Sequence, residues 1–534
     1  MIRRLKRKSI KATRLYQNFK PAMLLALVPI LVGIVSIGYV FSDYFQAQLA
    51  QRGSNRLISE NWQAASDLMV ANQPDYGPRA SYYVMEENQD LVWASYHFGV
   101  PLDQLKELNP GQIVYGTTIK VPPVQRALDP LEPDGFTDLP LTVAEADGAV
   151  IVSNQFNASE VRTTIPQLAE FLKPYDVMEQ VSPRHFRILR PLIIKTNIRL
   201  DITSETIDKL ELRSAPDFDF SCLCFEDAEV LISDVWITSY DPATGQPDYD
   251  HSDGRGFIRA LRSTRMDVIN SSITHLGHGL YAASERTPIM SNGATYGISW
   301  RIIDGSLGRD LVTGWVENST FSKNNFGSYT FGASGMMWRG NLFTENDVYG
   351  LDPHDDSNSA TIENNQFLNN GKHGFIVSKR CNYNVIRNNI STGNGLHGFM
   401  LHQDSVYNLM ENNIASGNTD NFAIYASSFN TVRGNSSYAP RASHLRINEG
   451  SVYTYVQNNL FHGGPRGVHI YGQSRGVLVI DNVFYGSREV LSLDEDSSNL
   501  VMTHNTVDKL AYELGHTETV AFGPNTVKNQ DPLK

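Results

Sequence analysis

Ile362-Glu-Asn-Asn365 is followed along the chain by four segments of the same kind: Ile386-Arg-Asn-Asn389, Met410-Glu-Asn-Asn413, Val432-Arg-Gly-Asn435 and Val456-Gln-Asn-Asn459. Their first residues lie 22 or 24 positions apart. A period of this size, with one apolar strand residue and an asparagine turn in each unit, is typical of a solenoid. The leucines of a leucine-rich repeat are missing. The pattern therefore predicts a mainly β protein built on a right-handed parallel β-helix.

The repeat extends in both directions from these segments. Trp338-Arg-Gly-Asn341 precedes them, Met502-Thr-His-Asn505 continues them, and Ile480-Asp-Asn482 fills the register between. We expect the β-helix to cover residues 146–525, with 526–534 as a tail. The asparagines should stack as a ladder in the turns, because Asn bonds its own backbone and tolerates left-handed conformations. A short amphipathic helix at 165–172 should cap the first coil, where an open strand edge invites aggregation.

Three segments 24 residues apart begin at Leu351, Phe375 and Phe399. Because side chains alternate along a strand, these three residues should face the core together with Pro353, Val377 and Leu401. The opposite parity gives an outward set: Asp352, His354, Ser378, Arg380, His402 and Asp404. His354 and Arg380 should be on the order of 8 Å apart at the backbone. Asp355 should turn away from this face unless the strand bends there.

An outward imidazole, guanidinium and carboxylate on neighbouring coils suit one kind of chemistry. A guanidinium binds a uronate carboxylate in a bidentate manner and stabilises the charge that develops when the adjacent proton leaves. An imidazole can take that C5 proton, and an acidic partner can orient the imidazole. Return of a proton on the opposite face gives an epimerase, whereas loss of the 4-O-linked sugar gives a lyase. Both reactions share the first step, so the cluster alone does not separate them.

Tyr349-Gly-Leu-Asp-Pro-His-Asp-Asp-Ser357, followed by His373-Gly-Phe-Ile-Val-Ser-Lys-Arg-Cys381, closely resembles the periplasmic mannuronan C5-epimerases of alginate biosynthesis, the AlgG type. The resemblance implies that His354 is the base and that Arg380 neutralises the substrate carboxylate. It also implies that Asp352 and Asp355 support the histidine and the sugar. The proton donor on the opposite face stays open between a water molecule and a tyrosine on a flanking coil, Tyr329 or Tyr425.

The polymer should also contact residues around this centre. We expect a local basic stripe of Lys379, Arg380, Arg387, His373, His397 and His402 that lets an acidic protein bind a polyuronate, and a further substrate contact from Asp404. His373-Gly374 and His397-Gly398, 24 residues apart, fit repeated turn chemistry as well as substrate contact. No Ca²⁺-binding nonapeptide repeat and no metal-ligand spacing of Cys and His is present, so we expect no metal and no cofactor.

The N-terminus differs from the rest of the chain. The first 20 residues contain eight Lys or Arg and no acid, although the whole chain has a net charge of −12. Residues 21–41 follow without a charge and are long enough to span a bilayer. With the basic tail on the cytoplasmic side, they predict a single-pass anchor in the cytoplasmic membrane and a periplasmic catalytic domain. A cleaved signal peptide is the alternative. In either case residues 45–534 lie outside the cytoplasmic membrane.

Between a linker at 42–80 and another at 124–145, residues 81–123 form a separate small unit. Tyr83-Val84 starts a strand, Asp90 and Pro101 open two helices, and Gly116–Pro122 returns as a turn and strand. This β-α-α-β order resembles a LysM domain, which implies binding to peptidoglycan or another glycan that contains N-acetylglucosamine. A spacer without ligand is the alternative.

The expected function is that of a mannuronan C5-epimerase, which converts β-D-mannuronate to α-L-guluronate within alginate. Two alternatives stay open: a polyuronate lyase, and a non-catalytic envelope protein that binds two glycans. The expected partners are the alginate polymer, a GlcNAc glycan, the membrane and an alginate export complex. Nucleic acid is excluded, because phosphate binding needs a basic face. The three cysteines, Cys222, Cys224 and Cys381, are expected to be buried thiols rather than a disulfide framework.

Overall fold

The computed structural model describes residues 62–533, apart from 72, 74, 88, 131–139, 155–159, 216–219, 253, 280–294, 516–519 and 529–530. Within these residues no helix is long and apolar enough to cross a membrane. The predicted basic tail and anchor, at 1–20 and 21–41, lie outside the described part. The first described helix is α3 (Trp62–Ala71), inside the stretch predicted as a linker.

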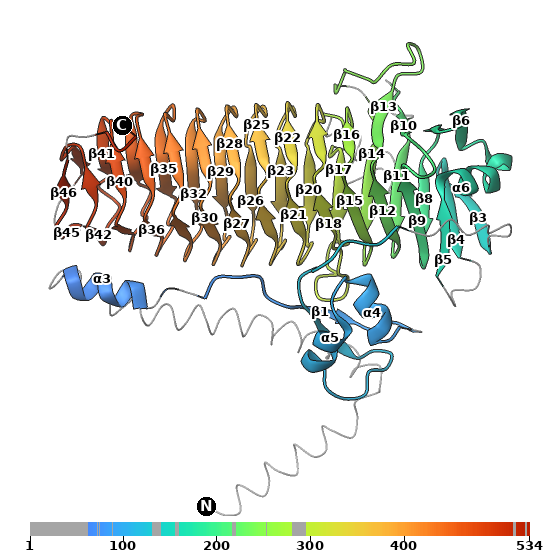
Figure 1. Cartoon of the computed structure of the whole chain (residues 1–534), viewed down its shortest axis with the longest axis horizontal. Helices are drawn as coiled ribbons and strands as arrows, with labels where there is room; N and C mark the ends of the chain where they lie inside the picture. Colours follow the sequence, from blue (N-terminus) through green and yellow to red (C-terminus); the bar gives the residue numbers. More distant parts are fainter. Residues whose placement is uncertain are drawn as a thin grey trace, which may run out of the picture. The chain divides into compact units, whose positions relative to one another are not determined.

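The described chain from residue 141 onward winds into coils that each add one short strand to three sheets of 15, 15 and 14 strands. Figure 1 shows the strands of successive coils stacked side by side. All neighbours in these sheets pair in parallel except the opening hairpins, β3–β4 and β6–β7. The fold prediction is therefore confirmed. The sheet that carries the site contains, in coil order, β17 (Ile298–Arg301), β20 (Ser328–Phe331), β23 (Leu351–His354), β26 (Phe375–Ser378), β29 (His397–His402), β32 (Asp420–Tyr425) and β35 (Ser443–Asn448).

The coils are held together by an apolar interior and by asparagine. One cluster of buried aliphatic and aromatic residues runs through the β-helix and includes Leu351, Phe375 and Phe399. Beside it, the last asparagine of each repeated segment is buried and its amide donates to the oxygen of the corresponding asparagine in the next coil at 2.9–3.1 Å. The ladder contains Asn341, Asn365, Asn389, Asn413, Asn435, Asn459, Asn482, Asn505 and Asn525.

The first asparagine of the pair has a different role. Asn364, Asn388 and Asn412 have φ between 54° and 59°, so they supply the left-handed turn residue. The ladder prediction is confirmed. In each asparagine pair the first residue forms the left-handed turn, and the second residue stacks in the ladder. The three cysteines are free and buried, also as predicted.

The ends differ slightly from the predicted bounds. The opening hairpin starts with β3 (Leu141–Ala146), inside the predicted linker, and the last strand is β46 (Thr526–Val527), inside the predicted tail. The predicted cap is α6 (Ile165–Phe171), which buries Ile165 and Leu168 and begins with a Thr164–Gln167 capping box. Figure 1 places α6 at the first coils.

The small unit has the predicted order of elements. It consists of β1 (Ser81–Val84), α4 (Leu91–His97), α5 (Leu102–Leu108) and β2 (Thr118–Val121), with β1 and β2 antiparallel. We call it the βααβ unit. It docks on the β-helix through buried polar groups: the His97 ring contacts Glu229 at 2.8 Å, and Arg265 donates to the carbonyls of Tyr96 and His97 at 3.0 Å.

The segment before β1 also lies against the β-helix. The Thr431 hydroxyl donates to the Tyr76 hydroxyl at 2.5 Å, and the backbone N–H of Arg79 donates to Ser359 at 2.9 Å. Residues 75–81 therefore form a strap along the coils, although the sequence suggested only a polar linker.

Candidate active site

Three neighbouring strands place the predicted outward residues. The register aligns His354 with Ser378 and Ser378 with His402, so His402 is two coils from His354, as predicted. Leu351, Phe375, Phe399, Val377 and Leu401 belong to the core, and Pro353 is buried. The predicted inward set is therefore confirmed, whereas Asp352 and Ser378 of the predicted outward set are buried, at 2% and 4% exposed.

Alternation does not continue past the strands, because each strand ends in two left-handed residues. Asp355 and Asp356 have φ of 32° and 61°, Lys379 and Arg380 have 63° and 61°, and Gln403 and Asp404 have 48° and 56°. Arg380 therefore lies in a turn rather than on the strand face, which corrects the prediction for Arg380 and Asp404. The bend also redirects Asp355, which strict alternation would have turned away.

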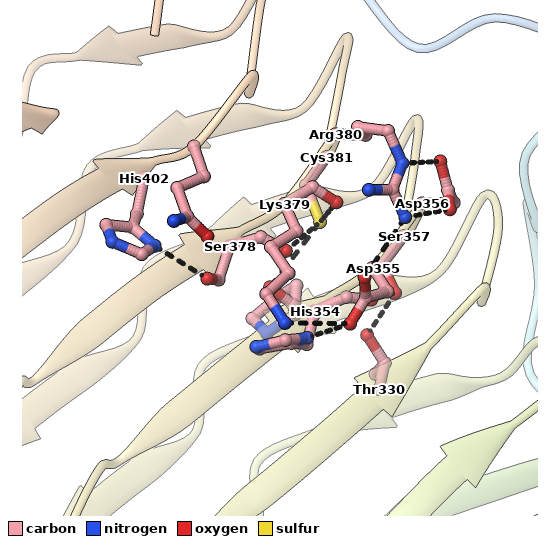
Figure 2. A network of polar contacts seen from close by, with 12 residues as sticks. Thr330, His354, Asp355, Asp356, Ser357, Ser378, Lys379, Arg380, Cys381 and His402 are labelled. Carbon is pink, nitrogen blue, oxygen red and sulfur yellow. Dashed lines mark hydrogen bonds and ion pairs between the residues drawn. The ribbon is translucent and has the colours of Figure 1, made fainter. Parts of the chain in front are cut away.

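The bend at Asp355 brings its carboxylate to the His354 ring, where it makes a short contact with Nδ1. The same carboxylate accepts from Nη2 of Arg380 at 3.0 Å and lies 3.9 Å from Nζ of Lys379. Arg380 also binds Asp356 through Nε at 3.0 Å and Nη2 at 2.8 Å. Figure 2 shows these residues converging around Asp355. One carboxylate thus links the imidazole to two cations.

The pKa values of the two buried groups move in opposite directions. Burial lowers the pKa of His354 by more than the negative charge of Asp355 raises it. Burial, reinforced by Asp355, raises the pKa of Asp352 well above its usual range. The Asp352 side chain is 2% exposed, and one of its oxygens has no hydrogen-bond partner in the described part of the chain. Near neutral pH the imidazole is therefore neutral, and the Asp352 carboxyl holds its proton to a higher pH than an ordinary aspartate does.

The buried Asp352 carboxyl leads to a stability prediction. A group whose folded pKa lies above its unfolded value, about 3.9 for Asp, stabilises the protein below the unfolded pKa and loses that contribution as pH rises toward the folded pKa. Asp352→Asn removes the cost of ionisation. We expect the melting temperature of the variant, relative to the unchanged protein, to increase between pH 4 and pH 8 in thermal melts. Asp404→Asn, at an exposed position, should show no such trend. A pH-independent difference for Asp352→Asn would contradict the prediction.

The two candidate tyrosines, Tyr329 and Tyr425, lie at very different distances from His354. Tyr329 is on the coil before His354, its ring centroid is 5.6 Å from that of His354, and the residue is 4% exposed. Burial raises the pKa of Tyr329. Tyr425 aligns with His402, so it is three coils from His354, about 14 Å at the backbone. Tyr425 is therefore not on a flanking coil, and the two phenols cannot serve the same sugar.

The other three histidines of the predicted site, His373, His397 and His402, contact neighbouring protein side chains. His402 exchanges a hydrogen bond with Ser378 at 2.9 Å and stacks on Tyr425 at 4.9 Å. His373 and His397 are both 6% exposed and stack on each other at 4.9 Å. His397 also contacts Asp420 at 3.2 Å and Arg446 at 3.0 Å.

Burial lowers the pKa of His373 to about 2, so this ring stays neutral. Arg387 lies on β27 (Val385–Arg387) in another sheet and pairs with Glu363. Of the predicted basic stripe, Lys379 and Arg380 therefore lie beside the site as cations, whereas Arg387 lies in another sheet and the His373 ring is uncharged.

Comparison with known proteins supports the fold and the resemblance seen in the sequence. The sequence model of a protein family described as the right-handed β-helix region matches residues 257–414 and 356–484 of this chain. The mannuronan C5-epimerase of Pseudomonas aeruginosa is 28% identical over 203 residues, which cover 38% of this chain and 35% of that protein. The enzyme of the same name from Pseudomonas fluorescens is 26% identical over 198 residues, covering 36% and 34%.

This chain is similar to mannuronan C5-epimerases. It spans about a third of the length of these two relatives. The crystal structure of the periplasmic alginate epimerase AlgG has a TM-score of 0.54 and 17% identity, and the match covers 87% of this chain and 96% of that one. The resemblance to AlgG-type epimerases is thus confirmed, and the structural likeness extends well beyond the aligned sequence.

The sequence reasoning missed two residues that lie beside the same site, Arg301 and Asp356. Arg301 lies over the rings of Tyr329 and Phe331 at 5.2 and 4.9 Å, and its charge contributes to the lowered pKa of His354. Its coil is 30 residues from the next one, because Ser299 aligns with Tyr329. A 24-residue spacing could not have found Arg301. Asp356, which binds Arg380, was also missed. Two consecutive aspartates directly after a strand could have indicated that both carboxylates lie at the site.

Proposed function

We propose that the chain is a mannuronan C5-epimerase that acts on polymeric alginate. The observation that carries the proposal is the His354–Asp355 contact, with Asp355 bound to Arg380 and close to Lys379. The similarity to named epimerases favours epimerisation over elimination as the second step.

His354 is the proposed base. When the Asp355 carboxylate accepts a hydrogen bond from the Nδ1–H group, the imidazole is held in the tautomer whose Nε2 has a free electron pair. The lowered pKa keeps the ring neutral at the pH of the periplasm. Asp355 is therefore a positioning residue, because it acts through the histidine.

Arg380 and Lys379 are the proposed partners of the substrate carboxylate. Hydrogen bonds to Asp355 and Asp356 use Nε and Nη2 of Arg380, and Nη1 makes no hydrogen bond within the described residues. Both cationic side chains are about half exposed. Nη1 and Lys379 Nζ can therefore receive a uronate carboxylate while Asp355 stays in place, and they stabilise the charge that develops when C5 loses its proton.

A proton must then reach C5 from the opposite face. Tyr329 or a water molecule is the proposed donor, because Tyr425 is three coils from the base. Burial and the nearby Asp355 charge raise the pKa of Asp352, and in its protonated form this carboxyl can donate a hydrogen bond to the sugar or to the substrate carboxylate.

Incubation of polymannuronate in deuterated water tests the function. An epimerase introduces deuterium at C5 and produces guluronate signals in NMR spectra without shortening the chain. A lyase produces unsaturated ends that absorb in the ultraviolet. If neither deuterium exchange nor unsaturated ends are observed, the chain is a glycan-binding protein without this catalytic activity. The same incubation with polygalacturonate tests whether alginate is the preferred polyuronate.

The pKa of His354 predicts how activity depends on pH. A base works only when it is unprotonated, so protonation of His354 should abolish activity at low pH. Because the pKa is lowered, the acid limb of kcat/KM should lie below the ordinary imidazole value of about 6.5. Initial rates of C5 exchange from pH 4 to pH 8 measure this limb. A limb above that value would contradict the proposal for His354.

Two further proposals concern the N-terminal part. We propose that residues 21–41 anchor the chain in the cytoplasmic membrane with the catalytic domain in the periplasm, where it works beside an alginate export complex. The length and lack of charge of this run support the anchor. Extraction of native membranes with carbonate, followed by immunoblotting, tests it, since a peripheral protein would be released.

We also propose that the βααβ unit binds a glycan that contains N-acetylglucosamine. The order of its elements supports this. Co-sedimentation of the whole chain with purified peptidoglycan tests it, and equal recovery without peptidoglycan would argue for a spacer.

A further inference from the structure

A pocket of about 210 Å³ lies where the βααβ unit meets the first coils of the β-helix, away from His354. Glu87, Trp93 and His97 of the small unit line one side, and Glu160, Asp227 and Glu229 line the other. This volume suits one sugar ring or a short chain and is smaller than the pockets of about 300–1,000 Å³ that take drug-sized ligands.

The pocket is strongly acidic. Four of these six residues carry carboxyl groups, and only some are matched by a cation: Arg162 contacts Glu160 at 2.5 Å, and Arg262 lies 3.9 Å from Asp227. Burial raises the pKa of Asp227 to about 6 and also raises the pKa of Glu160. Neighbouring cations therefore do not fully offset the lost hydration of these carboxylates. A polyuronate would be repelled here.

Glu229 adds an independent observation. This residue is 5% exposed, and its Oε1 contacts the ring of His97 at 2.8 Å. Its second oxygen, Oε2, is buried and has no hydrogen-bond partner within the described residues. A buried carboxylate oxygen without a donor is costly, so a donor that enters the pocket would be stabilising.

Trp93 supplies the aromatic wall. Its indole ring stacks on His97 at 4.4 Å, which fixes its orientation at the pocket. The face of an indole ring attracts a cation. No group of three or more His, Cys, Asp or Glu residues in the described part of the chain is arranged to hold a metal ion. These features favour an organic cation.

We propose that this pocket binds the primary ammonium group of a small organic cation, an amino sugar or a short diamine. The ammonium lies against the carboxylates, with Glu229 Oε2 accepting one of its hydrogens, and the apolar part of the ligand packs on Trp93. Because residues of both the βααβ unit and the β-helix line the pocket, a bound ligand also stabilises the docking of the βααβ unit on the β-helix.

Calorimetric titration of the whole chain tests the proposal with three probes: glucosamine, putrescine and N-acetylglucosamine. We expect saturable binding of at least one amine, roughly tenfold tighter than that of the uncharged N-acetylglucosamine, because acetylation removes the ammonium charge. Glucosamine binding would identify an amino-sugar site, and putrescine binding a diamine site. Equal affinity for N-acetylglucosamine, or no saturation by either amine, overturns the proposal.

A pair of variants provides the control. Glu87 is exposed at the pocket, whereas Glu107 is exposed on α5 and does not line it. Glu87→Gln should weaken amine binding about threefold or more, and Glu107→Gln should leave it unchanged. Unaltered binding by Glu87→Gln counts against the site. None of these measurements depends on epimerase activity, so failure here is distinguishable from failure of the proposed function.

Discussion

His354→Gln should lower the rate of C5 exchange by about 10²–10⁴-fold, the usual contribution of a general base. Glutamine preserves much of the shape and can still hydrogen-bond Asp355, but it offers no basic nitrogen at the pH of the assay. The measurement is the appearance of guluronate and of deuterium at C5 of polymannuronate.

The matched control is His462→Gln. His462 also pairs with a carboxylate, Asp531 at 3.2 Å, but it lies on β37 (Leu460–His462) in a different sheet. This variant should keep full activity. Melting curves for both variants separate loss of chemistry from loss of folding. Full activity in a folded His354→Gln protein would show that another group removes the proton.

Asn389→Ala should reduce the free energy of unfolding by about 3–5 kcal/mol, because it leaves several buried groups without partners. The Asn389 side chain accepts from the backbone and side-chain N–H groups of Asn365 at 2.8 and 3.0 Å. It donates to the Ile362 carbonyl and to Asn413, both at 2.9 Å. Urea denaturation measures the loss.

The adjacent Asn388 gives the control. It is exposed and has φ of 56°, a conformation that glycine adopts readily. Asn388→Gly should therefore change stability by less than about 0.5 kcal/mol. If Asn389→Ala cost no more than Asn388→Gly, the ladder would not contribute to stability.

The repeat made the fold predictable because the asparagine ladder and the apolar strand residues recur at one spacing. The same spacing correctly placed His354, Ser378 and His402 in one row. The repeat spacing did not predict three features of the structure. Arg380 was misplaced because the strands end in left-handed pairs, whose φ values depend on the turn. Arg301 was missed because its coil spans 30 residues, whereas the four coils that follow span 23 or 24. Docking of the βααβ unit was missed because contacts such as His97–Glu229 join residues 132 positions apart.

The ladder has a consequence for how such a protein can vary. Each asparagine bonds only to the coils directly above and below it, so a coil inserted or removed as a whole far from His354 leaves every remaining junction chemically the same. The length of the proposed polymer-binding face can thus change in whole-coil steps, independently of the chemistry. A family built this way can adjust how many sugars it holds by duplicating or losing a module.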